Sequence, residues 1–199
     1  MNHTIQCKCG MLKGYVSQPE DVINRGICYC KDCRDYAHVL GKAAETLDSS
    51  GGTEFVAVSP KNVVFTQGIE KLSCLSLSEK GLLRWYASCC NTPIGNTPRN
   101  FKVSFVGLVH NCLEQSEQTI VQSFGPVKMW VNTHGAKGKV NAKAGSTFMA
   151  IMRVMKVLLL SRLSGSYKTT PFFVAESGSP IKVPRIVSSA ERVESANAG

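Results

Sequence analysis

Residues 27–38, "ICYCKDCRDYAH", hold three cysteines, Cys28, Cys30 and Cys33, within six positions. The chain starts with "MNHTIQCKCG", which has neither a basic beginning nor an apolar stretch, so we see no signal peptide and expect a cytoplasmic protein. In such a compartment, closely spaced cysteines are more often metal ligands or reduced thiols than disulfides, and the odd total of nine cysteines agrees. The stretch therefore predicts a metal site.

Two further groups of cysteines accompany this stretch. Cys7 and Cys9 lie near the start of the chain, and Cys89 and Cys90 are adjacent to each other. Thiolates at these spacings can converge on one ion at about 2.3 Å, and tetrahedral Zn²⁺ is the usual occupant. The four cysteines would form a closed structural site. Cys89 joins it only if the chain turns at "SCCN", because adjacent residues of a strand point to opposite faces; otherwise His3 or another group must supply the fourth ligand.

Cys28, Cys30 and Cys33 would then form a separate site with three protein ligands. Three ligands with a fourth position open is the arrangement of catalytic zinc. We therefore expect about two zinc ions per chain. Redox chemistry at the Cys30–Cys33 pair, or an iron–sulfur cluster, is the less favoured alternative, because the βαβ context and a fourth ligand are missing.

The motifs "CKCG", "CYCKDCR" and "RWYASCCNTPIGN" resemble those of the glutathione-dependent formaldehyde-activating enzyme family, which includes centromere protein V. The resemblance covers about residues 5–110. It implies the β-tent, a zinc-stapled all-β fold. It also implies that the first and last motifs supply a structural zinc site and that the middle motif supplies the catalytic one. The structural ligands carried over by position are Cys7, Cys9 and Cys90, and the catalytic ligands are Cys28, Cys30 and Cys33.

The last motif departs from the family pattern. Ala87 stands where the family has the first cysteine, and Asn91 stands where it has a glycine. The resemblance implies a carbon–sulfur lyase that condenses formaldehyde with glutathione to S-hydroxymethylglutathione, or catalyses the reverse step. The implied partner is a small-molecule thiol such as glutathione. Lys31 lies within the catalytic motif and Arg34 follows it, and we expect both to be ordinary surface charges.

Short β-branched runs dominate the first two thirds of the chain. Residues 54–58 and 62–66 read as strands, 70–87 as two strands joined around "SEKG", and 100–109 as a half-buried strand. Residues 35–47 fit one short helix that Gly41 interrupts. The sequence therefore predicts a mainly β fold with a C-terminal α-helical extension.

The extension carries the chain's excess of positive charge. We divide the chain into a zinc-binding domain, residues 1–117, and a basic extension, residues 118–199, packed on the same domain. Residues 118–175 hold eight Lys or Arg and no Asp or Glu. A long helix is expected around 142–164, ending at Gly165, and beyond 165 we expect an extended segment with a frayed end. The helix carries an apolar stripe made of Phe148, Met152, Met155, Leu159 and Leu163.

We expect this stripe to pack on the domain and to leave Arg153 and Lys156 in solvent. The helix is too polar to span a membrane, although it could lie on an anionic membrane surface. The alternative function is a non-catalytic, zinc-stabilised module that binds nucleic acid or another anionic partner through the basic segment, with Trp130 and Tyr167 as residues that could stack on bases.

The remaining cysteines and histidines receive plainer interpretations. Cys74 and Cys112 are expected to be buried small side chains. His110 and His134 are candidate replacement ligands, but their spacing does not require that role.

Overall fold

Eleven strands in two sheets form the framework of the residues that the computed structural model describes, 2–113, 117–140 and 144–197. The smaller sheet is antiparallel and has the order β1-β2-β5, with β1 at His3–Gln6, β2 at Lys13–Val16 and β5 at Val63–Gln67. The larger sheet has eight strands in the order β10-β3-β4-β9-β8-β7-β6-β11. The expectation of a mainly β fold with a C-terminal helix is confirmed.

The six inner strands of the larger sheet pair with one another in antiparallel fashion: β3 Asn24–Cys28, β4 Thr53–Val58, β9 Val106–Val109, β8 Thr92–Thr97, β7 Leu83–Ala87 and β6 Leu72–Ser76. The edge strands, β10 at Met129–Val131 and β11 at Arg185–Ile186, pair in parallel with β3 and β6. Both edges therefore come from the segment after residue 117.

Apolar side chains from the two sheets meet in one core. Ile5 and Val16 of the smaller sheet and Trp85 and Leu108 of the larger one are fully buried there. Phe172, from the segment after the long helix, packs against Trp85 with ring centroids 5.2 Å apart. The segment after residue 165 thus contributes to the same core as the strands.

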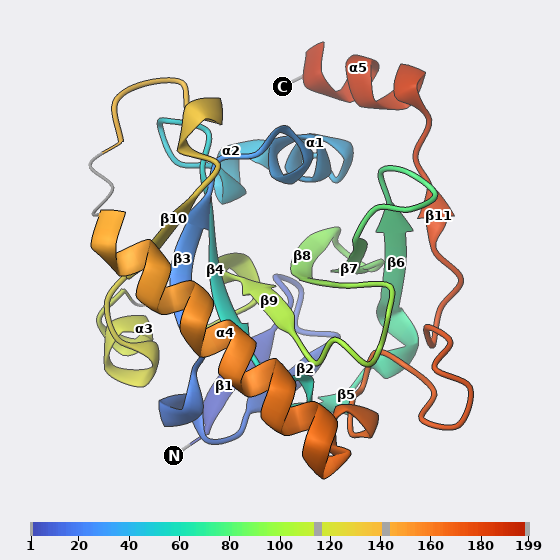
Figure 1. Cartoon of the computed structure of the whole chain (residues 1–199). Helices are drawn as coiled ribbons and strands as arrows, with labels where there is room; N and C mark the ends of the chain where they lie inside the picture. Colours follow the sequence, from blue (N-terminus) through green and yellow to red (C-terminus); the bar gives the residue numbers. More distant parts are fainter. Residues whose placement is uncertain (1, 114–116, 141–143, 198–199) are drawn as a thin grey trace.

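Five helices lie around the sheets within the described residues: α1 Lys31–Val39, α2 Ala43–Thr46, α3 Glu117–Phe124, α4 Ala144–Ser164 and α5 Ser189–Asn197 (Figure 1). Helix α1 covers one face of the larger sheet, where Tyr36 is buried and donates a 2.6 Å hydrogen bond to the Trp85 carbonyl. Gly41, with φ 65°, separates α1 from α2 as predicted. None of the helices in this part of the chain is long and apolar enough to cross a membrane.

The strand predicted over 100–109 is only partly correct. Residues 106–109 form β9, but the chain turns at 100–103, where the Lys102 amide donates to the Asn100 side chain and the Val103 amide to the Asn100 carbonyl. An asparagine that bonds its own backbone in this way competes with strand pairing. The predicted frayed end is also wrong for residues 189–197, which form α5.

The long helix was predicted correctly, but the face on which it packs was not. Helix α4 ends at Ser164, before Gly165 with φ 74°; residues 142–143 of the predicted range lie outside the described residues. Within residues 148–164, the part of the helix whose burial the structure describes, Ala150 and Ser161 are buried. The Ala150 carbonyl accepts a 3.0 Å hydrogen bond from the buried Asn24 side chain, so small residues let the helix approach β3 closely.

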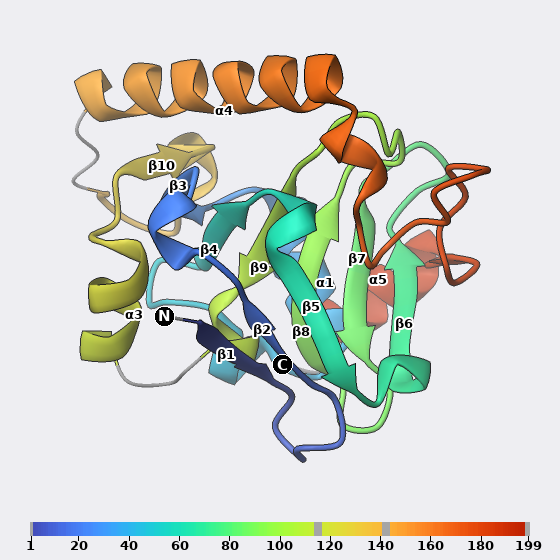
Figure 2. The same ribbon diagram turned by 90° about the horizontal axis from the view of Figure 1, so that it is seen from below.

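As a consequence, the stripe points outward. The exposed fractions of its members lie between 51% and 76%: Phe148, Met152, Met155, Leu159 and Leu163. Figure 2 shows α4 as the outermost layer along one side of the molecule. The expectation that the stripe packs on the domain is therefore wrong.

Candidate metal centres

Four cysteines from two hairpins meet at one end of the core. Cys7 and Cys9 lie in the turn between β1 and β2, and Cys89 and Cys90 lie in the loop between β7 and β8. The Sγ atoms are 3.5 Å apart for Cys7 and Cys9, 3.8 Å for Cys7 and Cys89, and 3.3 Å for Cys9 and Cys89. Those of Cys89 and Cys90 are 3.9 Å apart. We call this group the four-cysteine cluster.

These separations fit a tetrahedral ion. Four sulfurs at about 2.3 Å from one Zn²⁺ lie about 3.8 Å from one another, whereas a disulfide would require about 2.0 Å. All nine cysteines are free thiols. The four-cysteine cluster could therefore hold one metal ion with every coordination position filled by protein.

The loop between β7 and β8 explains how adjacent cysteines face the same point. Strand β7 ends at Ala87, and the Cys90 amide donates a 3.3 Å hydrogen bond back to the Ala87 carbonyl. Asn91 takes the left-handed conformation, with φ 54°, and reverses the chain. The required turn at "SCCN" is thus present, and Cys89 joins the cluster. The alternative ligand His3 instead lies 2.9 Å from Ser123 Oγ.

Within this cluster, the thiols of Cys7 and Cys90 have different pKa values. Burial raises the pKa of Cys7, although the Leu12 amide donates to its sulfur at 3.3 Å. Burial opposes ionisation at Cys90 as well. There, however, hydrogen bonds from Thr92 and from the backbone of Cys9 outweigh it and lower the pKa to about 6. The Cys90 thiol therefore has a lower pKa than the Cys7 thiol.

The second group, the three-cysteine cluster, lies where β3 leads into α1. Cys28 ends β3, Cys30 is the N-cap of α1, and Cys33 lies in the first turn of that helix. Their sulfurs lie within 4.8 Å of one another. The Cys33 amide donates to the Cys30 sulfur at 3.4 Å, and the positive end of the helix dipole favours thiolates here.

The three thiols share their charge unequally. Hydrogen bonds from Cys30 and Cys33 lower the pKa of Cys28 to about 2. Hydrogen bonds with Cys28 and, to a lesser extent, with Cys30 raise the pKa of Cys33 well above its ordinary value. Three converging soft donors, one of them a stabilised thiolate, suit a thiophilic cation such as zinc.

A buried arginine that sequence analysis did not single out lies beside this cluster. Arg84 on β7 is 2% exposed, and its Nη1 lies 3.9 Å from the Cys33 sulfur and 3.2 Å from Asn96 Oδ1. Its guanidinium is stacked over the Tyr36 ring at 5.3 Å, while Nη2 is 3.9 Å from Asp32. A charged residue inside the apolar run "LLRWYA" is the signal that could have identified it.

The residues after β10 complete the other side of the three-cysteine cluster. Because β10 pairs with β3, Val131 lies opposite Cys28, and the next residue, Asn132, directs its amide to the Cys28 sulfur at 3.5 Å. Arg34 fixes this loop by donating to the carbonyls of Tyr29 and Gly135.

Other candidates for ligands or substrate contacts have different roles. Lys31 is ion-paired with Asp35 at 2.7 Å. Cys74 and Cys112 are buried, as expected, and burial raises the pKa of Cys74 to about 12. Neither His110 nor His134 joins a metal-ligating group among the described residues.

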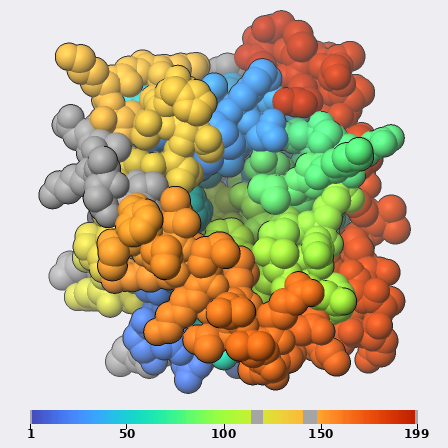
Figure 3. All heavy atoms as spheres, in the orientation of Figure 1, coloured from blue at the N-terminus to red at the C-terminus, as the bar shows by residue number. Residues whose placement is uncertain are grey.

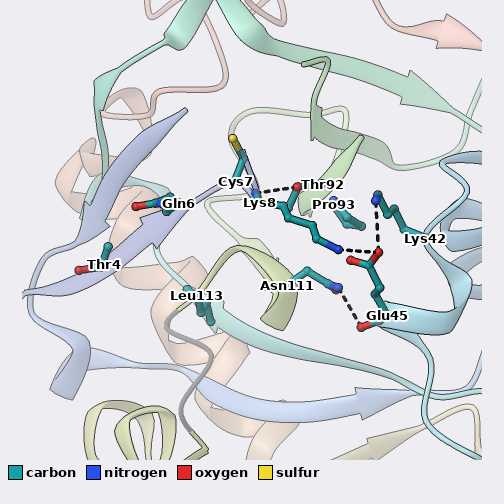
Figure 4. Close-up of a pocket in the computed structure, with 10 residues that line it drawn as sticks. All are labelled: Thr4, Gln6, Cys7, Lys8, Lys42, Glu45, Thr92, Pro93, Asn111 and Leu113. Atoms are coloured by element: carbon teal, nitrogen blue, oxygen red, sulfur yellow. Dashed lines mark hydrogen bonds and ion pairs between the residues drawn. The ribbon is translucent and has the colours of Figure 1, made fainter. Parts of the chain in front are cut away.

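A cavity of about 470 Å³ borders the four-cysteine cluster, not the three-cysteine cluster (Figure 4). Cys7 lies at its edge, and Lys8 and Lys42 both point to Glu45, with Nζ–Oε1 distances of 3.0 and 3.3 Å. The side chain of Asn111 donates to the Glu45 carbonyl. The charged groups of this cavity are thus paired with one another.

Comparison with known proteins gives a family without an activity. A family model described as "Family of unknown function (DUF6151)" matches residues 2–183. No curated protein matches the chain. The match includes both cysteine clusters and α4.

Proposed function

The chain belongs to the DUF6151 family, whose function is unknown, and we propose that it is a zinc-dependent carbon–sulfur lyase-like protein acting on a thiol adduct. S-hydroxymethylglutathione, the adduct of formaldehyde and glutathione, is the substrate we propose. The proposal includes kinship with the glutathione-dependent formaldehyde-activating enzymes and their zinc-stapled β-tent, which rests on the three cysteine motifs.

One observation carries the proposal: the two clusters are separate and differ in the number of thiols. Four thiols complete a tetrahedron at the ends of two hairpins, whereas Cys28, Cys30 and Cys33 supply only three. Structural zinc sites are closed and catalytic ones keep a position open. This difference supports a structural role for the four-cysteine cluster and a catalytic role for the three-cysteine cluster.

The proposed chemistry cleaves the bond between carbon and sulfur. The hydroxyl group of the adduct loses its proton and its oxygen becomes the carbonyl of formaldehyde. The carbon–sulfur bonding pair returns to sulfur, which leaves as the thiol once protonated. A zinc ion held by the three thiolates would supply a Lewis acid for thiol and aldehyde ligands.

The chain's own residues prepare this site. The N-terminus of α1 and the Asn132 amide favour a thiolate at Cys28. The Arg84 cation lies against Cys33 and offsets the negative charge that three thiolates would place in a buried environment. Arg84 is therefore a positioning residue.

Metal content and turnover test the proposal together. Protein purified without chelator should contain about two zinc ions per chain. The Cys30→Ser variant should retain the fold and about one ion, and it should lose turnover of S-hydroxymethylglutathione. The Cys9→Ser variant should instead unfold, because the four-cysteine cluster joins two hairpins.

Cys112→Ala is the matched control, since Cys112 is a buried thiol outside both clusters and its loss should leave both ions in place. Equal metal loss and equal unfolding in the Cys30 and Cys9 variants would refute the division into catalytic and structural sites. If the protein contains two zinc ions but turns over no thiol adduct in a panel of aldehydes and thiols, the lyase activity is refuted and the two metal sites are not.

The alternative, a zinc-stabilised module that binds nucleic acid, rests on the positive charge of residues 118–175. One of its two stacking residues is already engaged, because the Tyr167 ring packs edge-on against Phe101 at 5.4 Å. Binding of this kind should weaken steeply with salt. Fluorescence titration with a labelled single strand at two salt concentrations tests it.

A further inference from the structure

The outer face of α4 is a large apolar surface that the proposed activity does not use. Its five stripe residues lie within about 80° of one another on a helix that turns 100° per residue. Ile151 and Leu160 border the stripe, and they are 50% and 53% exposed. Soluble proteins rarely leave so many large side chains of one helix in water, and such patches usually mark an interaction surface.

Basic residues lie along both sides of this stripe. At the same helical pitch, Lys156 follows one edge of the stripe and Arg162 the other, each about 20° beyond the last stripe residue, and Leu160 and Ile151 lie beyond them. Both side chains are exposed, as is Arg153 farther round the helix. Residues 144–164 include no Asp or Glu. An apolar stripe between two cationic margins is the pattern of a helix that lies in the interface of an anionic membrane.

The position of α4 fits that use. Ala150 and Ser161 hold the opposite face of the helix against the protein, so the stripe can reach a flat surface without the helix leaving the fold. Figure 3 shows the α4 residues, in orange, running across the face of the molecule. Figure 2 shows the helix axis lying along one side of the molecule.

We propose that α4 docks the protein on the surface of anionic phospholipid bilayers, with the stripe among the acyl chains and Lys156 and Arg162 at the headgroups. A second copy of this chain fits less well. Packing α4 against α4 would bring Lys156 and Arg162 of both copies together, and α4 has no acidic residue to oppose them.

Vesicle flotation tests the proposal with the full-length protein. The wild type should float with vesicles of phosphatidylcholine and phosphatidylglycerol at low salt, and much less with pure phosphatidylcholine. The Lys156→Gln/Arg162→Gln variant should partition about 30-fold less, because each basic residue near an anionic surface is worth about 1 kcal/mol, a factor of about five. Lys61→Gln/Lys80→Gln removes two exposed basic residues elsewhere and should change partitioning less than threefold.

The apolar part of the surface needs its own variant. Met152→Gln/Leu159→Gln should lower partitioning at least tenfold, because burying a Leu or Met side chain is worth about 1.5–3 kcal/mol. Val183→Gln is the control, since Val183 is 92% exposed and lies outside α4. Circular dichroism and zinc content should be unchanged in all four variants, so that a loss of binding is not a loss of fold.

Three results would overturn the proposal. The first is the absence of wild-type binding to anionic vesicles. The second is binding that the basic variant weakens and the apolar variant leaves unchanged, which would indicate electrostatic adsorption alone. The third is a wild type that sediments as a dimer while the Met152→Gln/Leu159→Gln variant sediments as a monomer. That result would show that a second copy of the chain covers the stripe. None of these results bears on the lyase proposal, which is measured without lipid.

Discussion

At the scale of single residues, Arg84 is the buried charge beside the three-cysteine cluster. Its charge is almost fully buried, it touches the Cys33 sulfur, and the nearest carboxylate oxygen, on Asp32, is 3.9 Å away. Burying an arginine without a close carboxylate is costly unless another negative group compensates it. Thiolates that hold a metal ion at the cluster would be that group, and Arg84 would stabilise them in turn.

Replacing this charge should weaken the metal site while leaving the fold. In Arg84→Met the side chain keeps its apolar volume and loses its charge, and zinc affinity at the three-cysteine cluster should fall about 10–100-fold, as for other groups that orient ligands. Competition with a chelating dye measures it, with the ion of the four-cysteine cluster as an internal control. Unchanged affinity at both clusters would show that Arg84 has a packing role only.

Asp35 is the second residue whose charge has a measurable consequence. Its carboxylate accepts hydrogen bonds from Lys31 on α1 and from Arg192 on α5, and the carboxylate is 5% exposed. Burial raises the pKa of Asp35, but the bonds from Lys31 and Arg192 outweigh burial and hold it below the ordinary value of 3.8. Its stabilising effect is therefore complete above that value and is lost as the pH falls through the lowered pKa.

Asp35→Asn should lower the free energy of unfolding by about 2 kcal/mol at pH 7, since hydrogen bonds to charged groups are worth about 1.5–3 kcal/mol. Limited proteolysis should also release α5 sooner. The difference between variant and wild type should shrink below about pH 4, where the wild-type carboxyl starts to be protonated. Asp32→Asn, which removes a more exposed partner of Arg192, should cost less than about 1 kcal/mol.

At the scale of elements, the hairpin of β7 and β8 depends on the backbone of Asn91. Left-handed φ costs a residue with a Cβ atom about 1–2 kcal/mol unless it is Gly or Asn. Asn91→Gly should therefore be nearly neutral, and Asn91→Ala should lower the free energy of unfolding by about 1 kcal/mol. Chemical denaturation of the two variants measures the difference, and equal stability would show that the loop can close in another way.

The elements also show what the sequence could and could not predict. Residues 54–58 and 62–66 form β4 and β5 because their β-branched pattern matches a local requirement of strands. The length of α4 was predictable from its period and from Gly165. Its packing face was not predictable, because the helix has apolar residues on two faces and the surface that it meets decides which face is buried. Here the helix comes close to Asn24, and small residues allow that approach.

The candidate sites show the same contrast between local sequence patterns and contacts made by distant residues. The two cysteine clusters could be predicted because each draws on pairs or triples that are close in sequence. The contacts of Arg84 and Asn132 with the sulfurs could not, because β7 and β10 bring these residues to Cys33 and Cys28 from 51 and 104 residues away. Only the strand order of the larger sheet shows those contacts.

At the scale of the whole molecule, the four-cysteine cluster joins parts of the chain that are 82 residues apart. A ligand that binds only the folded state adds a stability of RT ln(1 + [L]/Kd), about 4 kcal/mol at a thousandfold excess over Kd. Removing zinc with a strong chelator should therefore lower the melting temperature markedly, and adding zinc back should restore it.

The Cys28→Ser/Cys30→Ser variant separates the contributions of the two clusters. It should retain most of the zinc-dependent shift in melting temperature, because the four-cysteine cluster remains intact. Magnesium should not replace zinc in either protein, since it prefers oxygen ligands. A zinc-dependent shift that disappears in this variant would assign the structural role to the wrong cluster.

The two parallel edge strands have a consequence for the newly made chain. The six inner strands of the larger sheet are complete once residue 109 has been made, yet β3 and β6 then remain open edges with unpaired amide and carbonyl groups. Such edges invite pairing with strands of other molecules until they are covered. Strand β10 covers one edge at residues 129–131, and β11 covers the other only at residues 185–186. Protection against aggregation during synthesis therefore arrives last, with the C-terminal segment.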